Sequence, residues 1–374
     1  MRVLVLVDHA VGISGPHRNV VGTLNALSAR EDVDLRVLTG KIDASEPYAT
    51  RCEIRLGFEP HQPRQAWKNL GLLRDAISDR DVVYVPTGLK SFLYAFAVKG
   101  KRKLVAGPNV TGIPILMNPA NPGPLMTTKM ADGWIEMSEV RVRECMSAGT
   151  PRERIYLIPH AIDTEKFNPK WCDRNVWQRE GLDPGTPKIV WVGDMSEELK
   201  GIPQLVEAFR LIRHAYTAPV DLVLIGKEGP MLTPGHRILP GLYLLGPRYG
   251  HDLVRLLASA DLFLAASRYE TFWFAPLEAM ACGLPVVVSK VGAVPLMIPE
   301  DGVQGRAVPV VDSEYHYVPD AAERLAQAAL PLLRSKELRI VMGHTARQHV
   351  LEHFSEARLS EDLVRTFSNV LQTA

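Results

Sequence analysis

The residue types best suited to chemistry lie in one stretch, SRYETFWFAPLEAMACGLPVVVS, residues 267–289. A buried strand is predicted up to Ser267, and the loop that follows carries Glu270. A helix is predicted from about Ala275 to Cys282, with Pro276 in its first turn. Glu270 is therefore expected at the carboxyl end of a parallel strand and beside a helix N-terminus, where open α/β sheets bind ligands.

The chemistry expected there is recognition of a diphosphate and of hydroxyl groups. A helix N-terminus has free N–H groups and a partial positive charge, which suit a diphosphate. Glu278 follows Glu270 by eight residues, and two carboxylates suit sugar hydroxyls rather than phosphates because they only accept hydrogen bonds. Lys200 lies in the loop before Gly201. Taken singly, Glu270 and Lys200 would be interpreted as solvated loop residues, and Glu278 as a first-turn acid favoured by the helix dipole.

Two series of apolar strands, separated by helical segments, are predicted to position these residues. The first series comprises residues 2–7, 34–39, 81–86, 103–107 and 154–159, and the second comprises 188–193, 221–226, 242–246, 261–267 and 285–289. Between them lies a polar, turn-rich segment, residues 168–187, so the boundary is placed near Lys166. The pattern predicts an α/β protein built from two Rossmann-like parallel-sheet halves.

Composition excludes several classes of protein. The 374 residues are 46% hydrophobic and 23% charged, which allows a sizeable core. A net charge of +1 from 43 Lys and Arg against 42 Asp and Glu gives no general argument for nucleic-acid binding. The one basic run is KGKRK, Lys99–Lys103, which is interpreted as a solvated helix end, with contact to anionic lipid or phosphate as the alternative.

The cysteines and the N-terminus indicate a cytoplasmic protein. Cys52, Cys145, Cys172 and Cys282 form no C-x-x-C pair, and scattered free thiols fit a reducing compartment. The apolar run Val3–Val7 is too short for a secretory signal or a spanning helix. Any membrane contact is therefore expected to be peripheral, at the inner membrane face.

The sequence resembles a known enzyme family in several motifs. Glu270 and Glu278 match the E-x7-E element of retaining GT-B glycosyltransferases, and EAMACGLPVV resembles the family-four enzymes, the glycosyl transferases group 1. The segments 192–209 and 137–169 are similar to that family's phosphate-binding loop and inter-domain segment. GISGPHRN, residues 12–19, resembles its glycine-bearing loop. The resemblance spans most of the chain and is weak between Ile42 and Asp132.

The resemblance implies a GT-B fold with two Rossmann-like domains facing across a cleft. Residues 1–165 would bind the acceptor, residues 166–353 the nucleotide sugar, and a helix in 354–374 would return to the first domain. The implied activity is retaining transfer of a hexose-type sugar from a UDP- or GDP-linked donor to a small-molecule, glycan or lipid-linked acceptor. No catalytic metal is expected, and the histidines of HVLEH, residues 349–353, are interpreted as part of a surface helix.

The resemblance also assigns roles to particular residues. Glu270 would contact hydroxyls of the donor sugar, Glu278 the ribose, and Lys200 the leaving diphosphate. Further donor contacts would come from Gly193, Gly246, Arg248, Trp273, Phe274 and Ala275. The acceptor and phosphate loops would be formed by Gly15, His17, Arg18 and Asn109.

Two residues depart from the family pattern. Asp194 stands where Arg is common, and it is expected to point away from the diphosphate or to pair with Lys200. Trp273 stands where Gly is usual, which would narrow the sugar pocket. The alternatives are therefore another GT-B activity, such as a phosphorylase or an epimerase, or a degenerate homologue that binds sugar nucleotide or glycan without turnover.

Overall fold

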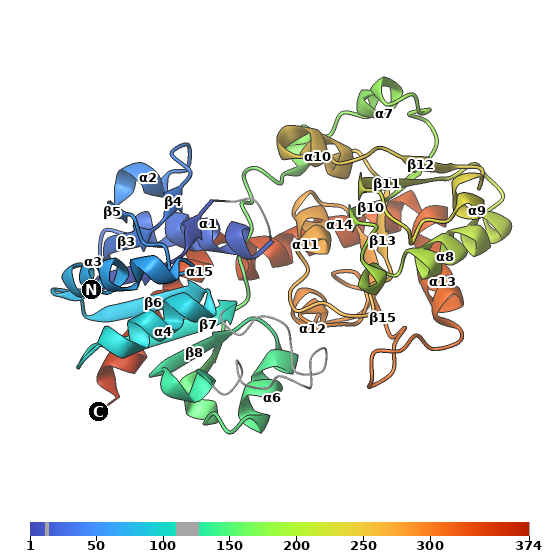
Figure 1. Ribbon diagram of the computed structural model, residues 1–374. Coiled ribbons are helices and arrows are strands. Elements are labelled where there is room, and N and C mark those ends of the chain that lie inside the picture. The colour runs from blue at the N-terminus through green and yellow to red at the C-terminus, as the bar shows by residue number, and fades with distance from the viewer. Residues whose placement is uncertain (12–14, 110–126, 374) are drawn as a thin grey trace. The chain divides into compact units, whose positions relative to one another are not determined.

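The computed structural model describes residues 1–11, 15–109 and 127–373 (Figure 1). The chain divides into two compact units, Met1–Ala161 with Glu356–Ala374, and Ile162–Ser355. The structure thus places the change of unit four residues before the 165/166 boundary expected from the sequence. It places the return to the first unit two residues after the expected 353/354 boundary.

The first unit contains a seven-stranded parallel sheet of order β5-β3-β1-β6-β7-β8-β9. Its strands are β1 (Arg2–Leu6), β3 (Asp34–Thr39), β5 (Glu53–Leu56), β6 (Val82–Thr87), β7 (Lys103–Asn109), β8 (Gly133–Glu136) and β9 (Ile155–Leu157). Its longer helices are α1 (Gly15–Ser28), α3 (Ala66–Ile77), α4 (Leu89–Val98), α6 (Glu139–Ser147) and α15 (Glu356–Gln372). Its shorter elements include β2 (His9–Ala10), β4 (Lys41–Ile42) and α2 (Tyr48–Arg51).

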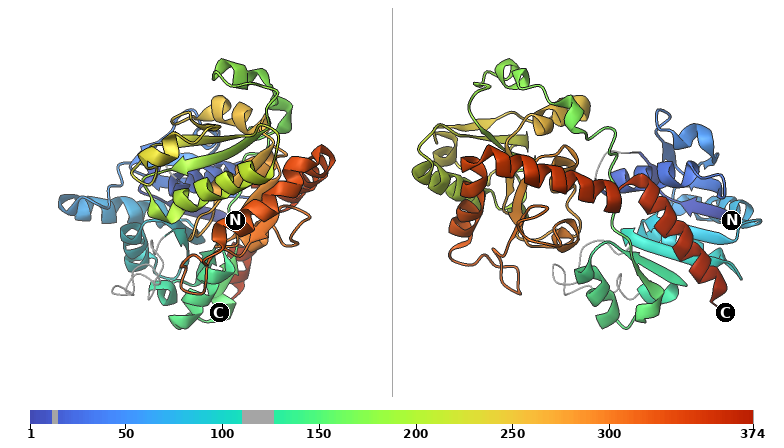
Figure 2. Two further views of the ribbon diagram at one scale, coloured as in Figure 1. Left: turned by 90° about the vertical axis from the view of Figure 1, so that its right-hand side faces the viewer. Right: turned by 180° about the vertical axis from the view of Figure 1, so that it is seen from behind.

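Alternation along the strands gives this sheet two apolar faces. Val3 and Val5 face a core shared with α1 and α15, whereas Leu4 and Leu6 face a core shared with α3, α4 and α6. The last helix of the chain, α15, therefore belongs to the first unit, and the view from behind shows it lying along that sheet (Figure 2).

The second unit contains a six-stranded parallel sheet of order β12-β11-β10-β13-β14-β15. Its strands are β10 (Lys188–Asp194), β11 (Asp221–Lys227), β12 (Leu242–Leu244), β13 (Leu262–Ala265), β14 (Val286–Ser289) and β15 (Arg306–Val308). Its helices are α7 (Asn175–Arg179), α8 (Ile202–Ala215), α9 (Pro234–Arg237), α10 (Gly250–Ala258), α11 (Phe274–Ala281), α12 (Val294–Met297), α13 (Ala321–Arg334) and α14 (Lys336–His353). The fold class expected from the sequence, two units with parallel sheets, is confirmed.

Within the described residues, every helix is too short or too polar to span a membrane.

Helix α14 packs closely against the end of α11 because the two residues at the contact, Gly343 and Gly283, have no side chains. Gly343 on α14 is buried against the carbonyl oxygen of Gly283, the residue just after α11, and a Cβ at position 343 would overlap that oxygen. By contrast, a Cβ on Gly71, in the middle of α3, would meet no atom within 4 Å. This packing matters for function because α11 carries the candidate site residue Glu278.

Gly343→Ala is expected to destabilise the second unit by about 3 kcal/mol, since the added methyl group must displace backbone. Gly71→Ala, the matched control, is expected to stabilise by about 0.5–1 kcal/mol because alanine favours the helix. Thermal unfolding measured by calorimetry tests both changes. Equal effects of the two substitutions would contradict the close α11–α14 contact.

Candidate active site

The candidate site lies at the carboxyl ends of the central strands of the second sheet. The chain goes from β10 to β11 on one side and later reaches β13 on the other side of β10, so the strand order reverses between β10 and β13. The loop after β10 carries Lys200, and the loop after β13 carries Glu270. Such a reversal point is where open α/β sheets bind ligands.

Lys200 and Glu270 form an ion pair, although 70 residues separate them in the sequence. The Lys200 Nζ lies 2.8 Å from Glu270 Oε1, and the same oxygen accepts a hydrogen bond of 3.2 Å from Ser267 Oγ. Glu197 Oε2 lies 3.6 Å from the ammonium group. The two paired side chains are mostly buried, with 20% of Lys200 and 11% of Glu270 exposed.

The pair keeps opposite charges in a partly desolvated place. Burial raises the pKa of Glu270, and the nearby Lys200 ammonium opposes that rise only in part. For Lys200, burial lowers the pKa, but attraction to Glu270 outweighs burial and the pKa is raised. Lys200 is thus a cation at neutral pH, held in place by a carboxylate and still partly exposed to an arriving anion.

Backbone contacts hold the Lys200 loop against the Glu270 loop. The N–H of Arg268 donates to the Leu199 carbonyl at 2.9 Å, and the Arg268 guanidinium lies 3.3 Å from Glu198. Gly201 adopts the left-handed conformation, with φ of 65°. A Cβ there would overlap the carbonyl oxygen of Ala266, so the position requires glycine for space as well as for its backbone angles.

A third segment, the loop after β15, supports the same two loops. The Tyr317 hydroxyl donates to the Ala266 carbonyl at 2.5 Å and lies against Gly201. Asp312 Oδ1 shapes this loop by accepting from two backbone N–H groups, each at 2.9 Å. Tyr315, with φ of 62°, places its ring edge-on to that of Tyr269, at 5.0 Å between centroids. Tyr315 and Tyr317 were not predicted from the sequence as site residues. Asp312, a residue type that favours turns, is the sequence feature that could have indicated this loop.

Helix α11 begins at Phe274, one residue before the start expected from the sequence, with Trp273 as its N-cap. Glu278 is on this helix and is 3% exposed. Trp273 is also buried. In the loop after β14, a Cβ on Gly292 would overlap the Glu270 carbonyl oxygen. The loop after β14 therefore packs against the backbone of the Glu270 loop.

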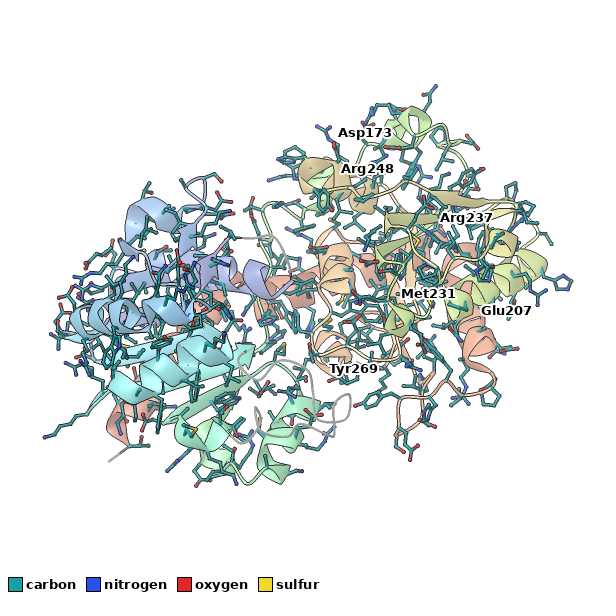
Figure 3. The ribbon with its side chains drawn as sticks, in the orientation of Figure 1. Asp173, Glu207, Met231, Arg237, Arg248 and Tyr269 are labelled. Carbon is teal, nitrogen blue, oxygen red and sulfur yellow. The ribbon has the colours of Figure 1, made fainter. Side chains whose placement is uncertain are left out.

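Gly193 lies at the end of β10 and Gly246 lies just after β12. They flank Gly226, which is in the strand between them, β11. A Cβ on Gly226 would overlap the Gly193 carbonyl oxygen, and the N–H of Gly226 donates to the Gly246 carbonyl at 3.0 Å. Arg248 follows on the loop after β12 (Figure 3) and pairs with Glu180 at 2.9 Å. The predicted donor-site residues Gly193, Gly246 and Arg248 therefore each contact other residues of the second unit.

Asp194 does not pair with Lys200, so that alternative of the sequence-based expectation is wrong. Its Oδ1 accepts from the backbone N–H and the hydroxyl of Ser196, at 2.8 and 2.5 Å, and its Oδ2 lies 3.4 Å from Lys227 Nζ. Hydrogen bonding from Ser196 and the charge of Lys227 lower the pKa of Asp194. The carboxylate is therefore engaged in shaping the start of its own loop.

The predicted residues of the first unit are only partly described. Gly15 is the first residue of α1, and Asn109 is the last residue of β7. The side chains of His17, Arg18 and Asn109 lie outside the part of the chain that the structure describes, as do residues 12–14.

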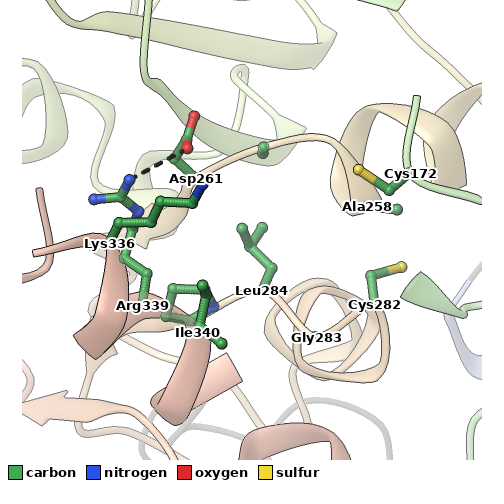
Figure 4. A pocket seen from close by; sticks show the side chains of 11 residues that line it. Cys172, Ala258, Asp261, Cys282, Gly283, Leu284, Lys336, Arg339 and Ile340 are labelled. Atoms are coloured by element: carbon green, nitrogen blue, oxygen red, sulfur yellow. Dashed lines mark ion pairs between the residues drawn. The ribbon is translucent and has the colours of Figure 1, made fainter. Parts of the chain in front are cut away.

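A separate cavity of about 260 Å³ lies at the opposite end of the second sheet (Figure 4). It is bordered by the residues that precede β13 and β14, including Asp261 and Pro285, and Asp261 lies 3.6 Å from Arg339. No candidate site residue lines it. Within the described ranges, no group of three or more His, Cys, Asp or Glu side chains could hold a metal ion.

Known proteins resemble this chain in sequence. Residues 186–335 match the family model of glycosyl transferases group 1. Alpha-maltose-1-phosphate synthase of Mycobacterium tuberculosis (strain CDC 1551 / Oshkosh) is 30% identical over 233 residues, which cover 58% of this chain and 57% of that protein. D-inositol 3-phosphate glycosyltransferase of Saccharomonospora viridis is 36% identical over 127 residues, 34% of this chain and 27% of that protein. The match thus spans little more than half of the first relative's length and about a quarter of the second's.

Solved structures resemble the chain over nearly its full length. Anabaena Alr3699/HepE in complex with UDP and glucose has a TM-score of 0.74 at 16% identity, covering 98% of this chain and 99% of that one. Sucrose-phosphate synthase from Thermosynechococcus elongatus has a TM-score of 0.73 at 19% identity, with 100% of both chains covered. At these identities the likeness shows the fold. Taken together, these comparisons show that the chain resembles the glycosyl transferases group 1 in sequence over residues 186–335 and GT-B glycosyltransferases in fold over nearly its full length.

Proposed function

We propose that this chain is a retaining glycosyltransferase that moves a hexose-type sugar from a nucleotide-diphosphate sugar, UDP- or GDP-linked, to a hydroxyl acceptor without a catalytic metal. The observation that carries the proposal is the Lys200–Glu270 pair at the reversal point of the second sheet. A cation and a carboxylate 2.8 Å apart, beside the N-terminus of α11, offer groups for a diphosphate and for sugar hydroxyls at one place.

The proposed roles follow from charge and hydrogen-bonding capacity. Lys200 balances the charge that develops on the leaving diphosphate, aided by the N–H groups at the start of α11. Glu270 accepts hydrogen bonds from the sugar and keeps the ammonium in place. Glu278 accepts from the ribose. In a same-face displacement, the leaving phosphate oxygen takes the acceptor's proton as the glycosidic bond breaks, and the acceptor oxygen bonds to the same face of the sugar carbon.

The acceptor is proposed to be a small molecule, a glycan or a lipid-linked sugar, bound by the first unit. The predicted residues Gly15, His17, Arg18 and Asn109 belong to this part of the proposal. We propose a cytoplasmic protein with no nucleic-acid partner, whose membrane contact is peripheral.

The second candidate is a homologue that binds sugar nucleotide without turnover. Its support in the sequence is Asp194 and Trp273. The structure weakens the argument from Asp194, because that carboxylate is engaged by Ser196 and Lys227. Incubation with each common nucleotide sugar, followed by measurement of slow nucleotide release, separates the two: release supports an enzyme, and binding without release or transfer supports the binder.

Glu270→Gln is expected to lower turnover by about a hundredfold, because a charged acceptor positioned on the sugar is lost. Glutamine keeps the shape of the side chain, so affinity for the free nucleotide diphosphate should change little. Steady-state kinetics and calorimetry measure the two effects. Near-normal transfer by a folded Glu270→Gln protein would refute the assigned role.

Lys200→Met is expected to weaken binding of nucleotide diphosphate far more than binding of the nucleoside, since electrostatic attraction in a partly desolvated site is several-fold stronger than in water. Lys227→Met is the matched control: this lysine is 68% exposed and pairs with Asp194. It should leave the discrimination unchanged, and Asp194→Asn should do the same. Calorimetry with nucleoside, monophosphate and diphosphate makes the comparison. If Lys200→Met discriminates as well as the unmodified protein, the phosphate site is elsewhere.

Tyr317→Phe is expected to lower kcat/KM by about tenfold, because the loops carrying Lys200 and Glu270 lose the hydroxyl that joins them. Tyr243→Phe, on the exposed surface of the second unit, serves as the control. The fall should occur with little change in Tm, and nucleotide-diphosphate affinity should fall with it. A Tyr317→Phe protein with unchanged kinetics would show that this contact does not position the pair.

A further inference from the structure

The first sheet has a reversal point of its own. The chain goes from β1 to its neighbour β3 and later reaches β6 on the other side of β1, so the strand order reverses between β1 and β6. Ligands of open α/β sheets bind at the carboxyl ends of the strands at such a point. Asp8 lies two residues after β1, and Gly88 and Ser91 follow β6.

The Asp8 carboxylate joins the ends of these two strands. Its Oδ1 accepts a hydrogen bond from the Ser91 hydroxyl, and a Cβ on Gly88 would lie only 3.2 Å from both carboxylate oxygens. Gly88, with φ of 89°, is the N-cap of α4, where the helix dipole attracts a negative group. The Asp8 side chain is only 14% exposed. It is thus held in a place that the backbone shapes for it.

His61 brings a third segment of the chain to the same place. It lies in the loop after β5, and its Nε2 is 2.6 Å from Asp8 Oδ2. The buried Asn69 of α3 anchors this loop, because its amide accepts from the Glu59 N–H at 3.1 Å and donates to the Glu59 carbonyl at 2.9 Å. The imidazole therefore reaches Asp8 from an anchored loop.

The Asp8–His61 pair leaves one ring nitrogen available to a ligand. A carboxylate only accepts hydrogen bonds, so Nε2 carries the hydrogen, and Nδ1 of the neutral imidazole has a lone pair. The His61 side chain is 60% exposed, and no residue that the structure describes bonds to Nδ1. The pair therefore presents a hydrogen-bond acceptor whose direction is set by the carboxylate.

The charge of the pair decides which ligand it suits. The pair carries one negative charge when the imidazole is neutral and none when it is protonated, so in neither state does it attract an anion as a free cation would. A hydroxyl group can donate to Nδ1, whereas a phosphate would be repelled by the nearby carboxylate. The geometry and the charge both favour a hydroxyl.

We propose that His61, positioned by Asp8, binds a hydroxyl of the acceptor, and that the acceptor is an uncharged polyhydroxy compound where it meets this pair. His61 Nδ1 accepts the hydrogen bond, and Asp8 fixes the orientation of the ring and the place of its hydrogen. The inference rests on the proposed sugar transfer and deepens it, because it names the residues and the chemical class for the acceptor.

A binding test uses the full chain in the presence of UDP or GDP, with its histidine rings labelled with carbon-13 for NMR. The spectrum of His61→Gln identifies the His61 signal. We expect glucose or myo-inositol, the neutral probes, to shift that signal, and inorganic phosphate, the charged probe, to leave it in place. His353 is the internal control, since it is 56% exposed and lies 3.7 Å from Glu352. Its signal should not move.

Kinetics separate this role from that of a structural link between two loops. Asp8→Asn and His61→Gln are each expected to raise the KM for the polyol about tenfold, the effect of losing one well-placed hydrogen bond. Slow nucleotide release without polyol should stay unchanged, as should the KM of His353→Gln. The double variant Asp8→Asn/His61→Gln should be little worse than either single one, because the two residues act as a unit.

Three results would overturn the inference. The first is a His61 signal that neither polyol moves. The second is a signal that inorganic phosphate moves and the polyols do not, which would assign the pair to an anion. The third is an unchanged KM for the polyol, or additive effects accompanied by a fall in Tm, which would make the pair a structural link. Failure of the proposed function is a different result: no nucleotide sugar is turned over, and the NMR test still decides whether the pair binds a polyol.

Discussion

The site depends on the mutual neutralisation of Lys200 and Glu270. A carboxylate that is 11% exposed and an ammonium that is 20% exposed are each costly to desolvate, and they remain charged because they lie 2.8 Å apart. Removing one partner would leave the other as an uncompensated, partly buried charge. The surrounding loops must therefore hold both charged groups in position, and the close backbone contacts at Gly201 and Gly292 do this.

This constraint accounts for the three loops that meet at the site. The loops after β10 and β13 carry the charges, and the loop after β15 joins them through Tyr317. The ammonium is thus preorganised before any ligand arrives, so an incoming diphosphate would meet a fixed charge instead of a mobile lysine. Asp194 has a different task, since it shapes the start of the first loop and balances Lys227.

Much of this could be predicted from the sequence, for physical reasons. Strands such as RVLVL and KIVWV are apolar on both faces, so the two parallel sheets and their order along the chain followed from the pattern. Strands β5 (EIRL), β8 (GWIE) and β15 (RAV) were not predicted, because they are short and carry charged residues or glycine. Glu270 and Glu278 were found from their places near a predicted strand end and helix start, and Lys200 was found through the resemblance of residues 192–209 to the family's phosphate-binding loop.

The remaining features depend on tertiary contacts that local sequence does not encode. Tyr317 reaches the site from 51 residues beyond Ala266, and the Arg268–Leu199 hydrogen bond joins two loops. Lys227 as the partner of Asp194 follows from the pairing of β10 with β11, which sets those two residues side by side.

The most direct measurement of the central claim is a crystal structure of the chain with UDP or GDP bound. The account predicts that the diphosphate lies within ion-pair distance of Lys200 Nζ and over the N-terminus of α11, with the ribose on Glu278. A nucleotide bound instead in the cavity beside Asp261, with the Lys200–Glu270 site empty, would contradict it.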